Sequence, residues 1–213
     1  MLNYKIKIFD NFLNDKDFQD LICYAQNLKI NREIHVFHNE IETNDNIINS
    51  SIDHNLLLRL NKNYLQKAKK ILEELNQDKA KLIDYSDFTI IRTNKNAKFP
   101  IHDDNVNKLL SGVIYLFPEK NTGTIFYNSK KGDNKTIIDW KPNRAVFFSR
   151  KERETWHSYE GDGVNDRIAL VYNLMTFKKN IKKVLEIEKK NYFYSNLRFN
   201  LNPYIYRIFK KII

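Results

Sequence analysis

The chain has 213 residues with a formal net charge of +10, and 42% of its residues are hydrophobic. This length fits one globular domain with a sizeable core, and the positive charge permits weak attraction to acidic partners. The single cysteine excludes an internal disulfide and favours a cytoplasmic location, and we expect neither a secretory signal nor a membrane-spanning helix.

The N-terminal segment predicts a strand followed by a helix. Residues 4–9 alternate polar and apolar side chains, which indicates a half-buried strand. Asn14 precedes an acidic first turn, as a helix N-cap residue does, and apolar residues recur at helical spacing over residues 15–28. Cys23 lies in this apolar run, so we expect it to be a small buried side chain.

The next segment is polar and then helical. Residues 30–54 contain only short apolar pieces, which predict either short strands or a long loop. His35 and His38 are spaced so that they could share a metal ion, but without a third ligand nearby we interpret them as a surface pair. Residues 55–77 carry an apolar stripe opposite a charged face, which predicts a second helix.

From residue 85 onward the pattern changes to short strands separated by turn residues. Many short strands at this spacing are typical of a sandwich or barrel, and a double-sheet jelly roll is the architecture we predict. The predicted strands are Phe88–Arg92, Ser111–Phe117, Gly123–Tyr127, Thr136–Trp140, Arg144–Phe148 and Ile168–Leu174.

The C-terminal segment returns to a helical pattern. Apolar residues between Ile181 and Glu188 predict a short amphipathic helix, and the remaining tail is basic and aromatic. We expect one domain over residues 1–178, with a helical cover at 14–77 and a jelly-roll core at 85–176. Residues 179–213 form an extension and no independent domain.

The tail allows two interpretations. It could bind nucleic acid or an anionic membrane surface, but we prefer a tail that packs on the core or on a second copy of the chain, because its apolar residues need cover. A monomer and a homodimer are both compatible with this. The tail residues concerned are Tyr192, Phe193, Tyr194, Arg198, Tyr204, Tyr206, Arg207, Lys210 and Lys211.

The pattern His102-x-Asp104 is the first candidate for chemistry. On an extended segment, alternation puts both side chains on one face while Asp103 points away. The pair is common by chance, so it needs a third ligand, and His157 is the candidate. Two histidines and one carboxylate favour iron(II) with open coordination positions over a closed structural zinc site. Trp156, beside His157, could form part of the pocket wall, or it could pack against other side chains without a role in the site.

Arg167 is the second candidate, because it opens the apolar run of residues 168–172. A charged side chain that faces a core needs a partner. Two interpretations stay open: an arginine at a strand edge in water, or a guanidinium fork aimed at a carboxylate that enters the barrel.

Taken together, His102-x-Asp104, His157 and Arg167 resemble the iron(II)/2-oxoglutarate-dependent dioxygenases, and most of all their prolyl 4-hydroxylase-like branch. The segments around these residues resemble that branch in the same order, over roughly residues 4–176. These segments are Lys5–Leu13 with the helix after it, Ser111–Leu116, Thr122–Phe126 and Arg144–Phe148.

The resemblance implies a fold that is α+β but mainly β. Its core would be a double-stranded β-helix (jelly-roll or cupin-like), with flanking N-terminal helices and a short C-terminal helical tail. His102, Asp104 and His157 would bind iron(II), and Arg167 would bind the distal carboxylate of 2-oxoglutarate. Tyr115 is a candidate second contact to 2-oxoglutarate, although the register of its strand puts Ile114 nearer.

The resemblance also implies the reaction. An unactivated C–H bond would be hydroxylated with consumption of O2 and release of succinate and CO2, and ascorbate is a candidate additional cofactor. A peptidyl prolyl residue and a small metabolite are the candidate substrates. The alternative is a non-catalytic jelly-roll module that binds a metal or a partner, and retention of His102, Asp104, His157 and Arg167 argues against it.

Overall fold

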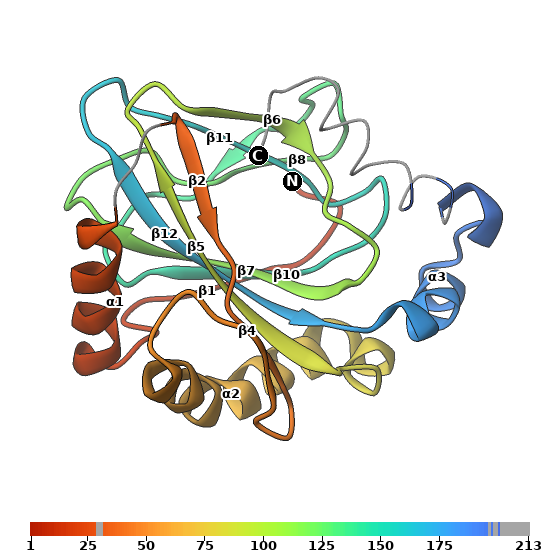
Figure 1. Ribbon diagram of the computed structural model, residues 1–213. Helices are drawn as coiled ribbons and strands as arrows, with labels where there is room; N and C mark the ends of the chain where they lie inside the picture. The colour runs from red at the N-terminus through yellow and green to blue at the C-terminus, as the bar shows by residue number, and fades with distance from the viewer. Residues whose placement is uncertain (29–31, 196, 198–199, 201–213) are drawn as a thin grey trace.

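The computed structural model of the protein describes residues 1–28, 32–195, 197 and 200. Two antiparallel sheets face each other in it, and helices cover one of them (Figure 1). The mainly β, α+β jelly roll is therefore confirmed. Of the tail residues named above, those outside the described part are Arg198, Tyr204, Tyr206, Arg207, Lys210 and Lys211.

The larger sheet has the order β1-β10-β7-β12-β5-β3-β4, with β2 also paired to β5. Its strands are β1 (Ile6–Phe9), β2 (Ile34–Phe37), β3 (Glu40–Glu42), β4 (Ile47–Asn49), β5 (Tyr85–Thr93), β7 (Lys108–Phe117), β10 (Ala145–Ser149) and β12 (Arg167–Met175). The smaller sheet has the order β6-β11-β8-β9. Its strands are β6 (Lys98–His102), β8 (Ile125–Tyr127), β9 (Thr136–Ile137) and β11 (Trp156–Glu160).

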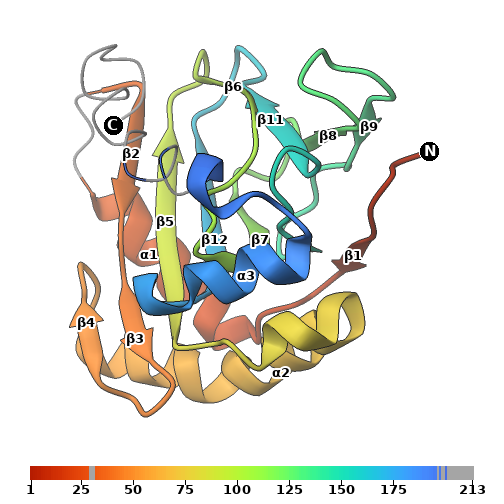
Figure 2. The ribbon, with the colours of Figure 1, turned by 90° about the vertical axis from the view of Figure 1, so that its right-hand side faces the viewer.

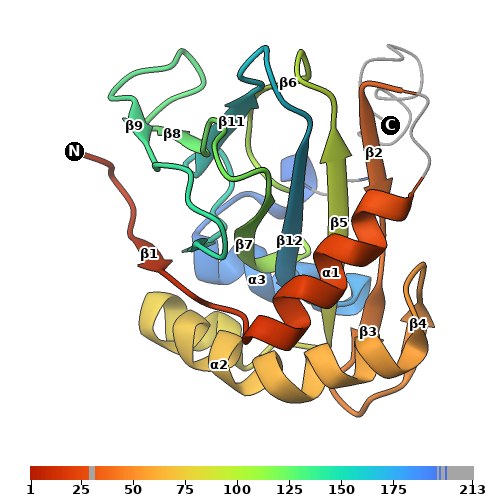
Figure 3. The ribbon, with the colours of Figure 1, turned by 90° about the vertical axis from the view of Figure 1, so that its left-hand side faces the viewer.

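The helices α1 (Asp15–Asn27) and α2 (His54–Ala80) lie on the outer side of the larger sheet, away from the smaller one (Figures 1 and 3). Asn14 caps α1 as predicted, because its side chain accepts a hydrogen bond from the Asp17 N–H. The expectation for Cys23 is wrong, since this residue is exposed. It lies two residues from the buried Leu21, and two residues turn a helix by about 200°, to the opposite face.

Alternation along the central strands separates the two sides of the larger sheet. In β12, Leu170, Tyr172 and Leu174 point into the core beneath the helices. The intervening Ala169 and Val171 point the other way, into the space between the sheets. This period of two gives the sheet one face for packing and one face for a site.

The C-terminal helix α3 (Ile181–Glu188) follows a 3₁₀ turn, η1 (Lys178–Asn180), and packs near α2 (Figure 2). Ile181, Val184 and Leu185 are buried in the same core as the residues beneath α1 and α2. The expected amphipathic helix is therefore confirmed, while the domain boundary at residue 178 stays a prediction. Within the described residues, none of the helices is both long and apolar enough to cross a membrane.

Candidate metal centre

Three side chains converge between the two sheets. His102 ends β6, Asp104 lies two residues beyond it, and His157 lies in β11, directly opposite His102 in the antiparallel register. One potential ligand atom from each lies within 4.8 Å of the others. The distance from His157 Nε2 to Asp104 Oδ2 is 3.9 Å.

Backbone carbonyls fix the orientation of both imidazoles. His102 Nδ1 lies 2.8 Å from the Pro100 carbonyl oxygen, and His157 Nδ1 lies 3.1 Å from the Thr155 carbonyl oxygen. A carbonyl oxygen can only accept, so each Nδ1 carries the proton and donates it. In the neutral ring this tautomer leaves the Nε2 lone pair available, as metal-binding histidines require.

Asp104 is kept ionised by its neighbours. Lys108 Nζ lies 2.8 Å from Oδ1, and the Ser111 hydroxyl donates to Oδ2 at 2.6 Å. Burial alone would raise the pKa of Asp104, but the Lys108 ammonium, together with the two imidazoles where they are protonated, outweighs it and holds this pKa well below its usual range. Asp103 faces elsewhere, because its Oδ2 accepts a hydrogen bond from the Arg153 N–H.

Burial lowers the pKa of His157, which is the opposite of its effect on the pKa of Asp104. Desolvation, followed by the neighbouring His102, lowers the pKa of His157 to about 4. The imidazole is therefore neutral at physiological pH and can bind a cation without first losing a proton.

The three side chains line a cavity of about 180 Å³ between the sheets. Arg167 and Lys108 bring positive charge to the same cavity, and most of its remaining wall is apolar. The apolar residues of the wall are Ile91, Phe99, Val113, Phe148, Ala169 and Val171.

Arg167 is the first residue of β12 and is buried, so the alternative of an arginine in water is wrong. Its guanidinium lies 3.7 Å from the ring centroid of Tyr159, and its Nε has no hydrogen-bond partner in the described structure. Desolvation lowers the pKa of Arg167. A buried guanidinium without a carboxylate partner among the described residues fits a ligand that brings its own carboxylate.

Tyr115 lies on the inner face of β7, buried near Arg167, with its ring 5.7 Å from the guanidinium. Its hydroxyl accepts from the Thr124 N–H at 2.8 Å, and Thr124 lines the cavity. The expectation that Ile114 lies nearer is wrong, because Ile114 points to the opposite face and packs beneath the helices. Whether Tyr115 contacts a ligand stays a prediction.

Trp156, His35 and His38, which were also named from the sequence, lie outside the triad. Trp156 packs with Ile125 and Tyr127 and does not line the cavity. His38 lies 2.9 Å from the Thr89 hydroxyl, and neither it nor His35 belongs to the triad.

Sequence reasoning missed Lys108 and Ser111. Their hydrogen bonds to Asp104 depend on how the chain turns between β6 and β7, and their spacing from Asp104 gives no periodic signal of that turn.

No protein-family model and no curated protein matches the sequence. Solved structures with a similar fold include a prolyl-4-hydroxylase from Pseudomonas putida, at 13% identity and a TM-score of 0.56, covering 82% of this chain and 94% of that one. A 2OG-Fe(II) oxygenase-family oxidoreductase from Burkholderia pseudomallei matches at 13% identity and a TM-score of 0.58, covering 80% and 84%.

A prolyl hydroxylase from Trichoplax adhaerens, solved with a hypoxia inducible factor peptide fragment, matches at 13% identity and a TM-score of 0.59, covering 85% of this chain and 87% of that one. The resemblance inferred from the sequence is thus confirmed at the level of architecture. The chain has the fold of the 2OG-Fe(II) oxygenases, including their prolyl hydroxylases.

Proposed function

We propose that the protein is an iron(II)- and 2-oxoglutarate-dependent dioxygenase that hydroxylates an unactivated C–H bond. One substrate, one O2 and one 2-oxoglutarate would give one hydroxylated product, one succinate and one CO2. The observation that carries this proposal is the meeting, in one cavity, of a two-histidine, one-carboxylate triad and a buried arginine whose Nε has no hydrogen-bond partner among the described residues.

The triad residues would hold iron(II) on one face. Two Nε2 atoms and one carboxylate oxygen form the donor set of non-haem iron oxygenases, which leaves coordination positions open. Lys108 and Ser111 orient the carboxylate, and the two backbone carbonyls orient the imidazoles. When bound, iron(II) and 2-oxoglutarate together supply the oxidising chemistry.

Arg167 would bind the far carboxylate of 2-oxoglutarate. Arg167 lines the same cavity as the triad, and its guanidinium lies 3.7 Å from the Tyr159 ring centroid. Around it, the apolar side chains of Val113, Ala169 and Val171 lower the local polarity, which strengthens a charge-assisted hydrogen bond.

The size of the cavity favours a substrate that reaches in from outside. At about 180 Å³ it is smaller than the roughly 300–1,000 Å³ of typical pockets for drug-sized ligands. It therefore suits the small cosubstrate together with one inserted group, such as the side chain of a peptide. Among the structures of similar fold, the Trichoplax adhaerens prolyl hydroxylase is bound to a peptide, so we favour a peptidyl side chain, with proline as the first candidate.

Succinate release tests the proposal. Purified protein would be incubated with iron(II), 2-oxoglutarate and O2, with and without ascorbate and with libraries of proline-containing peptides and small metabolites. We expect succinate formation that needs iron and oxygen, that a substrate stimulates, and that His157→Ala abolishes. Wild-type protein that binds iron but releases no succinate across the screen would instead support the non-catalytic binding module. The role of ascorbate stays a prediction until that comparison is made.

A further inference from the structure

The turn between β10 and β11, residues 150–155, contacts two of the three triad residues. Arg150 Nε donates a hydrogen bond of 3.0 Å to the backbone carbonyl of Asp104. At the other end of the turn, the Thr155 carbonyl accepts the hydrogen bond from His157 Nδ1. The position of this turn therefore bears on both the carboxylate and one imidazole of the proposed metal site.

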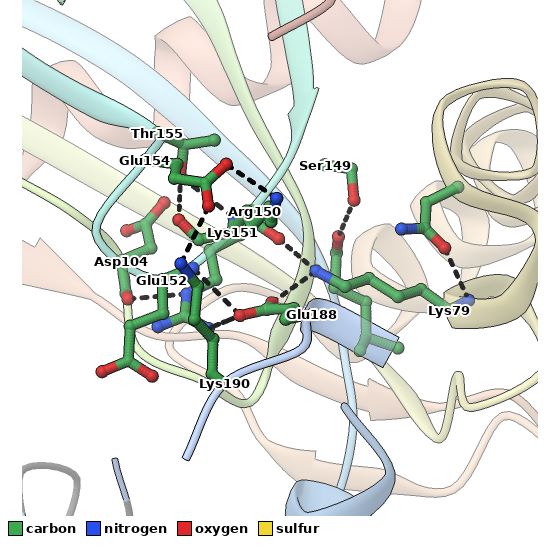
Figure 4. Close-up of polar contacts among 12 residues, drawn as sticks. Lys79, Asp104, Ser149, Arg150, Lys151, Glu152, Glu154, Thr155, Glu188 and Lys190 are labelled. Atoms are coloured by element: carbon green, nitrogen blue, oxygen red, sulfur yellow. Dashed lines mark hydrogen bonds and ion pairs between the residues drawn. The ribbon is translucent and has the colours of Figure 1, made fainter. Parts of the chain in front are cut away.

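Arg150 is in turn held by the C-terminal helix. Its side chain is only 2% exposed, and NH1 lies 2.9 and 3.1 Å from the two carboxylate oxygens of Glu188, the last residue of α3 (Figure 4). The same carboxylate accepts from the Glu152 N–H at 2.9 Å. Just beyond the helix, Lys190 Nζ lies 2.8 Å from Glu154 Oε1. Thus α3 and the residues after it hold the turn at several points.

Lys79 of α2 completes the buried cluster. Its Nζ lies 2.6 Å from Glu188 Oε1 and also donates to the Arg150 carbonyl oxygen (Figure 4). Two buried cations therefore share one buried carboxylate. Burying charges costs free energy that their attraction only partly offsets, so such a cluster adds little to stability. Its geometric effect is more specific, because Arg150 also donates from Nε to the backbone carbonyl of Asp104.

We propose that Arg150 is a positioning residue for the metal site and that Glu188 makes α3 part of that site. Glu188 fixes the Arg150 side chain, Arg150 holds the backbone at Asp104, and the carboxylate of Asp104 is thereby placed opposite the two imidazoles. This inference rests on the proposed function, because it assigns the cluster to the affinity of the same metal site.

Two substitutions separate this role from a merely structural one. Arg150→Met leaves Lys79 and Glu188 as a balanced ion pair, and it removes the contact with Asp104. Lys79→Met leaves Arg150 and Glu188 as a balanced ion pair, and it keeps that contact. Because neither variant strands an unpaired carboxylate, both should fold with similar losses of stability, and they differ in the link to Asp104.

Titration of the metal-free proteins with cobalt(II), followed by its visible absorption, measures the affinity. We expect the Kd to rise roughly 10- to 100-fold in Arg150→Met, as is usual when residues that orient metal ligands are removed, and to stay within about threefold in Lys79→Met. Glu188→Gln, which keeps one acceptor for Arg150, should lie between the two. Arg150→Lys, which keeps the charge without the planar fork, is the second variant if Arg150→Met does not fold, and it should also weaken binding.

Hydrogen exchange in the metal-free proteins distinguishes Arg150→Met from Lys79→Met by a second measurement. Hydrogen exchange of the Lys108 amide, which donates to the Asn105 carbonyl in the turn after Asp104, should be at least about tenfold faster in Arg150→Met than in Lys79→Met. Equal cobalt affinities and equal exchange in the two variants would overturn the inference while leaving the proposed function intact. If Glu188→Gln bound cobalt(II) with wild-type affinity, α3 would have no part in positioning the metal ligands. Wild-type protein that binds no cobalt would overturn the proposed function and this inference with it.

Discussion

Asp103 and Asp104 are adjacent carboxylates with different surroundings. Asp104 faces the imidazoles of His102 and His157, whereas Asp103 accepts a hydrogen bond from the Arg153 backbone. Alternation predicted this division from the sequence alone. What the sequence did not predict is how Lys108 and Ser111 fix the Asp104 carboxylate, since both hydrogen bonds depend on a turn of the chain.

The two carboxylates give a matched pair of variants. We expect Asp104→Ala to weaken divalent-metal binding by at least about 100-fold, because it removes a ligand, with little loss of fold. Asp103→Ala should change the metal Kd by less than about threefold, at a stability loss of about 1 kcal/mol for its hydrogen bond. Calorimetric metal titration of both proteins measures this, and equal losses of affinity would contradict the assignment of Asp104 over Asp103 as the ligand.

His157 makes the metal-free protein sensitive to acid. An unfolded histidine titrates near 6.5, and burial lowers the pKa of His157 in the folded protein to about 4. Between these values the unfolded state binds more protons, so the free energy of unfolding falls as the pH is lowered from about 6.5 to 4.

We expect this fall to reach about 3 kcal/mol and to be absent from His157→Gln, in urea unfolding followed across that pH range. In a magnetic resonance titration of the metal-free wild type, the ring should titrate near pH 4. A midpoint at or above 6.5 would show that the imidazole is not desolvated.

At the scale of elements, the sequence predicted the helices and the long strands but missed β6 and β11, which carry the two histidines. β6 contains Pro100, which argues against a strand in the middle of a sheet, and the structure places β6 at an edge, where proline is tolerated. β11 lies between two strands and is buried on both faces over Trp156–Tyr159, so it shows no alternation.

A buried asparagine joins two elements far apart in the sequence. Asn143, in the turn before β10, has a positive φ of 59°, and its side chain bonds both the N–H and the carbonyl of Leu13. Asn134 has a similar φ of 52° but is exposed.

We expect Asn143→Ala to lower the free energy of unfolding by about 2–4 kcal/mol, because it adds backbone strain and leaves two buried backbone groups unpaired. Asn134→Ala should lower it by only about 1 kcal/mol, the cost of the backbone conformation alone. Chemical unfolding measures both, and equal losses would show that the contact with Leu13 contributes nothing.

At the scale of the whole molecule, the two sheets hold the site between them while α1, α2 and α3 close the outer core. The jelly roll was predictable because short strands and turns alternate over the second half of the chain. The cluster of Lys79, Arg150 and Glu188 was not, because it joins α2, the β10–β11 turn and α3 through contacts without periodicity. Whether the chain is a monomer or a homodimer stays a prediction.

Truncation tests how far the folded unit extends. A chain ending at residue 178 loses the buried side chains Ile181, Val184 and Leu185, together worth about 5–8 kcal/mol, and leaves Lys79 and Arg150 without their carboxylate. That loss is comparable with the whole stability of a typical domain, so we expect no cooperative unfolding transition. A chain ending at residue 191 should unfold cooperatively. If the shorter chain were as stable as the longer one, α3 would be dispensable for folding.

Joint binding of iron(II) and 2-oxoglutarate is measured most directly by an anaerobic titration of the iron-loaded protein with 2-oxoglutarate, followed by the visible charge-transfer band of the chelate. We expect the wild type to develop the band at one 2-oxoglutarate per chain. Arg167→Met should need at least about tenfold more 2-oxoglutarate, because it loses a charge-assisted hydrogen bond, and His157→Ala should give no band. A wild type that binds iron(II) and yet shows no band at any 2-oxoglutarate concentration would contradict an oxygenase site between these sheets.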